Sequence, residues 1–149
     1  MLPTRQVAML PDVNVLVAAH HAGHPHHAVA AQWLQQAPSA QDTLVLPMPV
    51  ISGFLRLVTN GRIFLTPSTT EQAVDFVDWL LESPHVRLQD IAAEWPRLRK
   101  LMLEKNLVAN QVPDAWLASL ALSLSEPFVT FDKDFKRLLP RSLLRMLSA

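Results

Sequence analysis

The chain has 149 residues and half of them are hydrophobic, which suffices for one compact core but not for two ordinary domains, so we expect one domain over residues 1–149. It contains no cysteine, which excludes disulfide bonds, thiolate catalysis and cysteine-based zinc sites. Thirteen basic and thirteen acidic residues cancel, which excludes a uniformly basic surface; a polyanionic partner would have to bind a local patch.

The N-terminal segment has no features of an export signal. Met1–Leu10 carries one arginine and a short apolar run, without the hydrophobic core of a signal peptide. No later stretch reaches the length of a membrane-spanning helix. We therefore expect a cytoplasmic protein that does not contact a membrane.

Short β-prone runs alternate along the chain with longer stretches whose apolar residues recur at helical spacing. The expected strands are Val7–Pro11, Thr43–Leu46, Val86–Leu88, Phe128–Phe131 and an edge strand Leu144–Leu147. The expected helices are Asn14–Ala19, Pro25–Ala37, Val50–Thr59, Thr69–Ser83, Ala92–Asn106, Pro113–Leu124 and a short one at Phe135–Leu139. This alternation predicts an α/β fold in three layers, with a mostly parallel sheet between two layers of helices.

Three aspartates stand at equivalent places in this pattern. Asp12 ends the first strand, Asp132 ends the Phe128–Phe131 strand, and Asp114 lies just inside the start of a helix. In an open parallel sheet the carboxyl ends of the strands form one crevice, so these acids, with Asp134 two residues further on, are expected to crowd together. Like charges at that range raise one another's pKa unless a cation neutralises them.

A hard divalent cation such as Mg²⁺ or Mn²⁺ suits a site built from carboxylates alone. Such an ion supports hydrolysis of phosphodiester bonds, which gives the expected reaction class. The alternative for each acid is structural: aspartate is among the best helix N-caps, and capping together with compensation of the helix dipole could explain any one of the three. Three acids at strand ends or helix starts in one small chain favour the cation site.

Four segments, in their order and spacing, resemble the PIN domain of VapC-type toxins, the ribonuclease half of bacterial toxin–antitoxin pairs. They are Leu10–Val17, Gly53–Asn60, Asn110–Ala118 and Thr130–Phe135, and the resemblance covers nearly the whole chain. The last two segments are specific as a pair, because an aspartate opens an apolar helix and a Thr-x-Asp-x-Asp-Phe run follows about one helix later.

The resemblance implies a PIN-like sheet of four or five strands and a Mg²⁺- or Mn²⁺-dependent endoribonuclease acting on RNA such as tRNA or rRNA. It also implies a homodimer and a cognate VapB-type antitoxin that covers the site. The residues that match the family's metal-binding and catalytic acids are Asp12, Asp114 and Asp132, with Asp134 as an additional metal ligand and Asn14 and Thr130 as supporting polar residues.

One position departs from the family. Many members carry a glutamate early in the third helix, whereas the matching region Val50–Arg56 has Gly53 and no acid. A second reading is therefore a degenerate PIN module that binds RNA or antitoxin without cutting. A third reading keeps the metal site but assigns it to DNA or to another phosphoester.

Several groups outside the acids have two readings each. Arg56 is expected to contact RNA by family analogy, and His27 to lie at the substrate entrance. The other clustered cations, Arg62, Arg97, Arg99, Lys100 and Lys105, fit either phosphate contacts or a salt-bridged surface. The histidines His20, His21, His24, His26 and His27 fit a zinc site, an RNA-contacting loop or a solvated helix connection. The tryptophans Trp33, Trp79, Trp95 and Trp116 are expected in the core or in a dimer contact rather than stacked on bases.

Overall fold

The computed structural model describes residues 7–39 and 41–148. Its strands are β1 (Val7–Pro11), β2 (Asp42–Pro47), β3 (Val86–Gln89), β4 (Phe128–Thr130) and β5 (Leu144–Met146). Its α-helices are α1 (Val13–His20), α2 (His27–Gln36), α3 (Met48–Val58), α4 (Thr70–Leu81), α5 (Trp95–Lys105) and α6 (Gln111–Leu124). Short 3₁₀ helices η1 (Ala92–Glu94), η2 (Lys133–Arg137) and η3 (Arg141–Leu143) complete this part of the chain.

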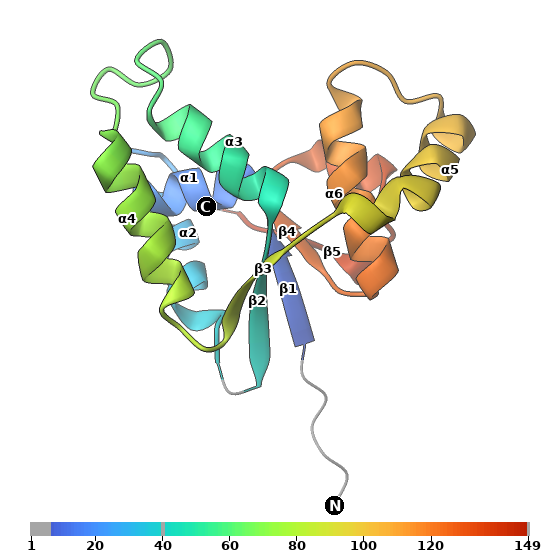
Figure 1. The fold of residues 1–149 in the computed structure, drawn as a ribbon, viewed down its shortest axis with the longest axis horizontal. Coiled ribbons are helices and arrows are strands. Elements are labelled where there is room, and N and C mark those ends of the chain that lie inside the picture. The colour runs from blue at the N-terminus through green and yellow to red at the C-terminus, as the bar shows by residue number, and fades with distance from the viewer. Residues whose placement is uncertain (1–6, 40, 149) are drawn as a thin grey trace, which may run out of the picture.

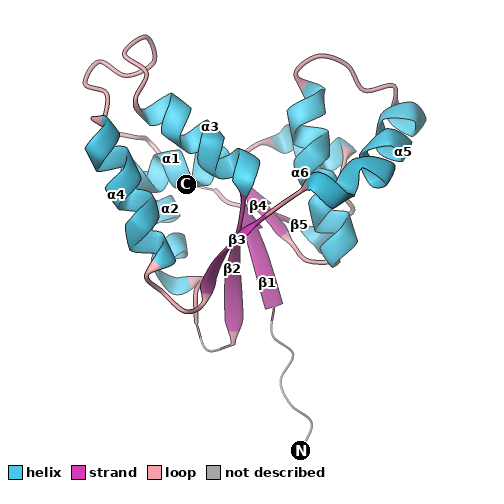
Figure 2. Ribbon diagram, in the orientation of Figure 1, coloured by secondary structure: helices cyan, strands magenta, loops and turns pink. Residues whose placement is uncertain are grey.

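Within the described residues the strands form one five-stranded sheet in the order β3-β2-β1-β4-β5, and every pair is parallel. Helices cover both faces, with α1 to α4 on one side and α5 and α6 on the other (Figure 1, Figure 2). The predicted α/β class, the parallel sheet and the edge strand near Leu144 are confirmed. No helix among the described residues is long and apolar enough to cross a bilayer.

The central strand β1 has β2 on one side and β4 on the other, which makes its carboxyl end a topological switch point. Leu10 pairs with Phe128 and Pro11 with Val129, and the Asp12 amide then donates to the Val129 carbonyl at 2.8 Å. The ladder therefore continues one residue beyond β1. This register brings Asp12 to the same edge of the sheet as the residues that follow β4.

The core lies between the sheet and its helices, because strands covered on both faces must be apolar throughout. Leu10, Leu44, Leu46 and Phe128 of the strands are fully buried, as is Phe54 of α3. The tryptophans, expected in the core or in a dimer contact, divide into two pairs. Trp33 and Trp116 pack against the core, whereas Trp79 and Trp95 are 50% and 55% exposed.

The helix ends follow local chemistry where a capping residue is present. Thr69 caps α4 in a capping box with Gln72, and Asn106 ends α5 in the left-handed conformation at φ 50°. The expected helix from Ala92 is instead a 3₁₀ turn followed by α5, which starts at Trp95 with a proline in its first turn. The expected α-helix at Phe135–Leu139 is the 3₁₀ helix η2, two residues earlier, because the Asp132 side chain starts the turn.

Gly53 lies where α3 crosses the first turn of α1. A Cβ atom at this position would stand 2.9 Å from Cγ2 of Val13, closer than side-chain atoms pack. Val13 is β-branched and has little freedom to rotate away inside a helix. Glycine is thus the residue that lets α3 approach α1 beside Asp12, and a glutamate at position 53 has no room in this packing.

We expect Gly53→Ala to lower the free energy of unfolding by about 1 kcal/mol, because a steric cost of about 1–3 kcal/mol exceeds the gain of about 1 kcal/mol in helix propensity. Urea denaturation of wild type, Gly53→Ala, Val13→Ala and the double variant measures this. A favourable coupling of about 1 kcal/mol between the two substitutions is expected. Simple additivity would contradict the close contact.

Candidate active site

Asp12 is held at the switch point by two hydrogen bonds. Its Oδ1 accepts from the Val13 amide at 2.7 Å, and its Oδ2 accepts from the Thr130 hydroxyl at 2.6 Å. The side chain is only 7% exposed, and this burial raises its pKa from 3.8 to about 6, with the charge of Asp132 adding to the rise and the two hydrogen bonds opposing it. Asp12 thus caps α1 through one carboxylate oxygen, but this hydrogen bond lowers the pKa by less than burial raises it.

Thr130 joins the ends of β1 and β4 through its hydroxyl group. Its Oγ1 donates to Asp12, accepts from the Asp132 amide at 2.9 Å and accepts from Asn14 Nδ2 at 3.3 Å. The amide of Phe131 donates to Asn14 Oδ1 at 3.4 Å. A hydroxyl has one donor and two acceptor positions, so all the hydrogen-bonding capacity of Thr130 is used. The structure thus places both predicted supporting residues beside Asp12.

Asp114 approaches the same point from α6. The pKa of Asp114 is raised to about 6, mainly by burial and in addition by the charges of Asp12, Asp132 and Asp134. Asp114 lies in the first turn of α6 and is not its N-cap, which is Asn110. Capping therefore does not account for Asp114, whereas compensation of the helix dipole still fits an acid in the first turn.

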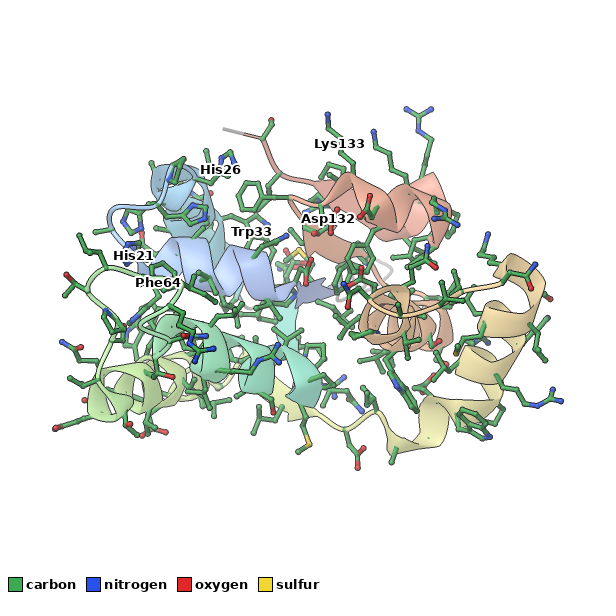
Figure 3. All side chains as sticks on the ribbon, turned by 90° about the horizontal axis from the view of Figure 1, so that it is seen from above. His21, His26, Trp33, Phe64, Asp132 and Lys133 are labelled. Carbon is green, nitrogen blue, oxygen red and sulfur yellow. The ribbon has the colours of Figure 1, made fainter. Side chains whose placement is uncertain are left out.

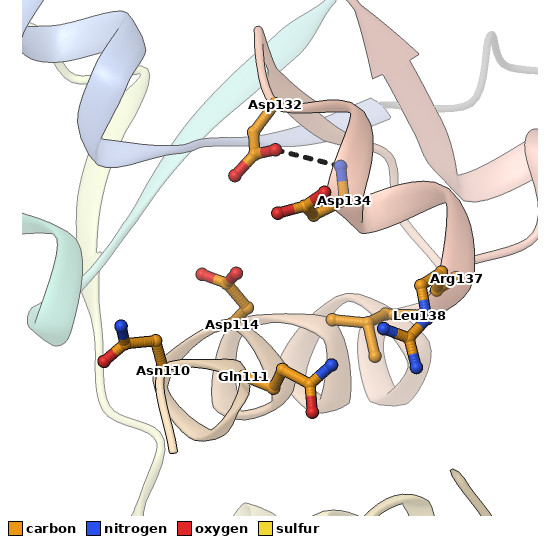
Figure 4. A pocket seen from close by; sticks show the side chains of 7 residues that line it. All are labelled: Asn110, Gln111, Asp114, Asp132, Asp134, Arg137 and Leu138. Atoms are coloured by element: carbon orange, nitrogen blue, oxygen red, sulfur yellow. Dashed lines mark hydrogen bonds between the residues drawn. The ribbon is translucent and has the colours of Figure 1, made fainter. Parts of the chain in front are cut away.

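A cavity of about 300 Å³ opens between α6 and η2 (Figure 4). Asp114 faces it from α6, with Asp132 and Asp134 on the opposite wall and Arg137 at one side. Asp132 Oδ1 accepts from the Asp134 amide at 2.9 Å, so Asp132 is a capping residue as well as a wall of the cavity. The remaining lining residues are Asn110, Gln111 and Leu138.

The donor set is suited to a hard cation, since carboxylate oxygens dominate and none of the lining residues offers sulfur or imidazole. In the described part of the chain, no three acidic or histidine side chains lie close enough together to coordinate one metal ion as they stand. Mg²⁺ commonly keeps several waters and uses only one or two carboxylates, so an open arrangement of this kind fits it.

The sequence pattern of the PIN domain family matches residues 9–138. The chain belongs to the PIN-domain family. Ribonuclease VapC31 of Mycobacterium tuberculosis is 37% identical to this PIN domain over 129 residues, 86% of this chain and 91% of that protein. Ribonuclease VapC25 of the same species is 38% identical over 132 residues, with 86% and 91% covered. The resemblance to VapC-type toxin ribonucleases is thereby confirmed.

Two solved structures share the fold of this PIN domain. VapBC2 from Rickettsia felis, bound to a DNA fragment from its promoter, has a TM-score of 0.67 at 20% identity and covers 94% of this chain and 98% of that one. Mycobacterium tuberculosis VapC20, described as a toxin that cleaves the sarcin-ricin loop, has a TM-score of 0.65 at 17% identity and covers 86% and 92%. At these identities the likeness concerns the fold alone.

Two residues expected to contact RNA lie away from the lining of this PIN domain's cavity. Arg56 is exposed in the last turn of α3. The ring of His27 is half-buried, and its Nδ1 hydrogen-bonds to the Ala18 carbonyl at 2.9 Å, which ties α2 to α1. A role for either in binding RNA stays a prediction, and His27 has a structural role beside it.

The five histidines are used in packing rather than gathered around an ion. His20 hydrogen-bonds to Ser68 at 2.8 Å and meets Phe54 and Phe76 edge-on. His26 stacks on Phe131 with ring centroids 4.6 Å apart. Figure 3 shows His21 beside Phe64, at a distance from His26. Packing against aromatic rings was not among the three roles considered for this cluster.

Sequence reasoning missed three polar residues of the cavity: Asn110, Gln111 and Arg137. Asn110 and Gln111 precede Asp114 by four and three residues, the spacing that places side chains on one face of a helix. Arg137 follows Asp134 by three residues, which places both on one face of a 3₁₀ helix. The first signal requires the true start of α6, and the second requires that η2 is a 3₁₀ helix rather than an α-helix.

Asp12 makes the stability of the metal-free protein depend on pH. The pKa of Asp12 is about 6 in the folded state and 3.8 ordinarily, so the folded state binds the proton more tightly than the unfolded state. The free energy of unfolding therefore falls as the pH rises from about 3.8 to about 6. In EDTA we expect Asp12→Asn to be more stable than wild type at pH 7.5, by about 1–3 kcal/mol, and nearly equal to it at pH 4. Urea melts across this range measure it. Asp78→Asn, on the exposed face of α4, should follow wild type, and a constant difference between Asp12→Asn and wild type would contradict the assignment.

Replacing Thr130 by valine removes the hydroxyl and leaves the shape almost unchanged. We expect a loss of about 1–3 kcal/mol in unfolding free energy, because Asp12 and the Asp132 amide lose their partner. The pKa of the Asp12 carboxyl should rise further, because this hydrogen bond lowers it. Thr130→Ser is the matched control: it keeps the hydroxyl and should retain most of the unfolding free energy and a pKa of Asp12 close to that of wild type. Titration of the Asp12 carboxyl by NMR distinguishes the variants; an unchanged titration in Thr130→Val would contradict the role of the hydroxyl.

Proposed function

We propose that this protein is a VapC-type endoribonuclease toxin that hydrolyses RNA phosphodiester bonds with Mg²⁺ or Mn²⁺ and is neutralised by a VapB-type antitoxin. The observation that carries the proposal is the convergence of Asp12, Asp114, Asp132 and Asp134 at one end of the sheet. The relatives that are 37% and 38% identical to it over the aligned residues are ribonucleases by name, which supports RNA as the substrate class.

Burial raises the pKa of both Asp114 and Asp12, and the charges of Asp12, Asp132 and Asp134 add to the rise at Asp114. A cation would relieve this cost of holding the carboxylates ionised. A divalent cation would favour the ionised form of both groups and so oppose the rise of their pKa. Asp12, Asp114 and Asp132 would hold it, with Asp134 as a further ligand. When bound, such an ion stabilises the charge that develops on a phosphoryl oxygen.

The protein's own groups prepare the site for such a substrate. Thr130 and Asn14 fix the carboxylate of Asp12 in one orientation, so no reorganisation is needed when charge arrives. Arg137 brings a positive charge to the wall of the acidic cavity, where it can hold a non-reacting phosphate oxygen.

A second candidate is a PIN module that binds RNA or antitoxin without cutting. Gly53, at the position where many members carry an acid, favours it, as does the absence of a finished three-ligand cage among the described residues. Three aspartates around one cavity, with Asp12 close enough for its charge to act on Asp114, favour the nuclease. Cleavage of DNA on the same site is a third outcome that the experiment below separates.

We expect purified protein to cleave RNA in Mn²⁺ or Mg²⁺ and to stop in EDTA. Asp12→Asn and Asp114→Asn should each lower the rate about 100-fold or more, because each removes a metal ligand. Gel assays on a structured RNA, an unstructured RNA and a single-stranded DNA measure this, with Asp78→Asn as the control on α4.

Cleavage that survives the chelator or the Asp12→Asn substitution would refute the mechanism. No cleavage of any RNA, together with no heat of metal binding in calorimetry, would establish the second candidate. The toxin role is checked in cells: expression should arrest growth, and the product of a neighbouring small gene should relieve the arrest.

A further inference from the structure

A group of basic residues lies at the β5 edge of the sheet. Of thirteen basic residues in the chain, five lie between residues 133 and 145, where the single acid is Asp134. We call four of them the C-terminal strip: Lys133, Lys136, Arg137 and Arg141. The fifth, Arg145, lies on β5, and its Nη1 donates to Met9 Sδ at 3.4 Å. All five are exposed, and among the described residues none of them forms an ion pair with a carboxylate.

The 3₁₀ form of η2 sorts its side chains into three directions, because it has three residues per turn. Phe135 and Leu138 point into the core, at 0% and 7% exposure. Asp134 and Arg137 line the acidic cavity. Lys133 and Lys136 are left for the third, outer direction, and Figure 3 shows Lys133 at the margin of the molecule beside Asp132.

A second hollow, of about 560 Å³, lies next along the chain between η2, η3 and β5. Lys136 and Arg141 line it together with the apolar Leu139, Leu144 and Met146. Because Lys136 and Arg137 are consecutive, one residue faces each cavity, and the basic groups lead from the carboxylates to the outer hollow without interruption.

The opposite edge of the sheet carries the opposite charge. Helix α4, which packs beside β3, presents Glu71, Asp75, Asp78 and Glu82 to solvent, and no lysine or arginine occurs between residues 63 and 86. A polyanion is therefore repelled from that edge and attracted to the β5 edge. Solubility alone would not require acidic residues to gather at one edge of the sheet and basic residues at the other.

We propose that the C-terminal strip is the track on which single-stranded RNA lies as it enters the active site. Arg137 holds the phosphate next to the carboxylates, and Lys136 and Arg141 hold phosphates further along, over the apolar floor of the second hollow. This inference rests on the proposed function for its choice of RNA, and on the strip itself for the position of the track. Recognition of this kind is by backbone charge and carries no sequence preference.

The test measures RNA binding separately from cleavage. Fluorescence anisotropy with a short fluorescein-labelled single-stranded RNA is recorded in EDTA over a range of salt concentrations, and gels verify that the RNA stays intact. The track variant is Lys136→Ala/Arg141→Ala. Its matched control is Arg99→Ala/Lys105→Ala, which removes the same charge from exposed positions on α5.

We expect the track variant to bind about tenfold more weakly and to lose about 0.7 from the slope of log affinity against log salt for each phosphate contact removed. The control should match wild type, and thermal melts should show both variants folded. Unchanged affinity and slope in the track variant would overturn the inference. Tighter binding of a polyglutamate peptide than of RNA through Lys136 and Arg141 would also overturn it, by assigning the strip to an acidic protein.

The two proposals fail in different ways. If the track variant binds and cleaves RNA as wild type does, while Asp12→Asn does not cleave, the inference is wrong and the nuclease stands. If wild type cleaves no RNA with any metal but binds it through Lys136 and Arg141, the nuclease is wrong and the track stands.

Discussion

The hydroxyl of Thr130 links the two strands on which the site is built. It is the only atom in the described residues that bonds to Asp12, Asp132 and Asn14 together, and it does so where β1 and β4 end side by side. The parallel register of these strands decides that the three residues meet at all. Asp114 and the cavity are then placed by α6, which packs its buried face on the other side of the same sheet.

The acids are held together against their own repulsion, and the fold supplies the free energy. Burying Asp12 at 7% exposure costs stability in the absence of a cation, since its charged form is disfavoured. Functional sites are commonly strained in this sense, and the surrounding core must compensate. Here the compensation comes from strands that are apolar on both faces and from close helix packing such as that of Gly53 on Val13.

The sequence indicated the fold class and the acids, and the physical reason is that both depend on local patterns. Strand ends are visible where an apolar run stops, so Asp12 and Asp132 could be placed at one edge of the sheet before any coordinates. The wall formed by Asn110, Gln111 and Arg137 could not, because it requires the true start of α6 and the 3₁₀ form of η2. The place of Gly53 against Val13 is a contact between helices and leaves no local signal. Arg56 was assigned by family analogy and His27 as part of the histidine cluster, and neither lines the cavity.

The three-way division of η2 bears on how this surface segment can change in evolution. Exposed connections ordinarily accept insertions and deletions with little effect. Adding one residue within η2 would turn every later side chain by about 120° around the helix axis. Arg137 would then turn from the acidic cavity to the core position that Leu138 now holds, so the acidic wall would lose its arginine and a charged side chain would face the core. Descendants of this gene should therefore keep the length of this segment even where they exchange its individual residues.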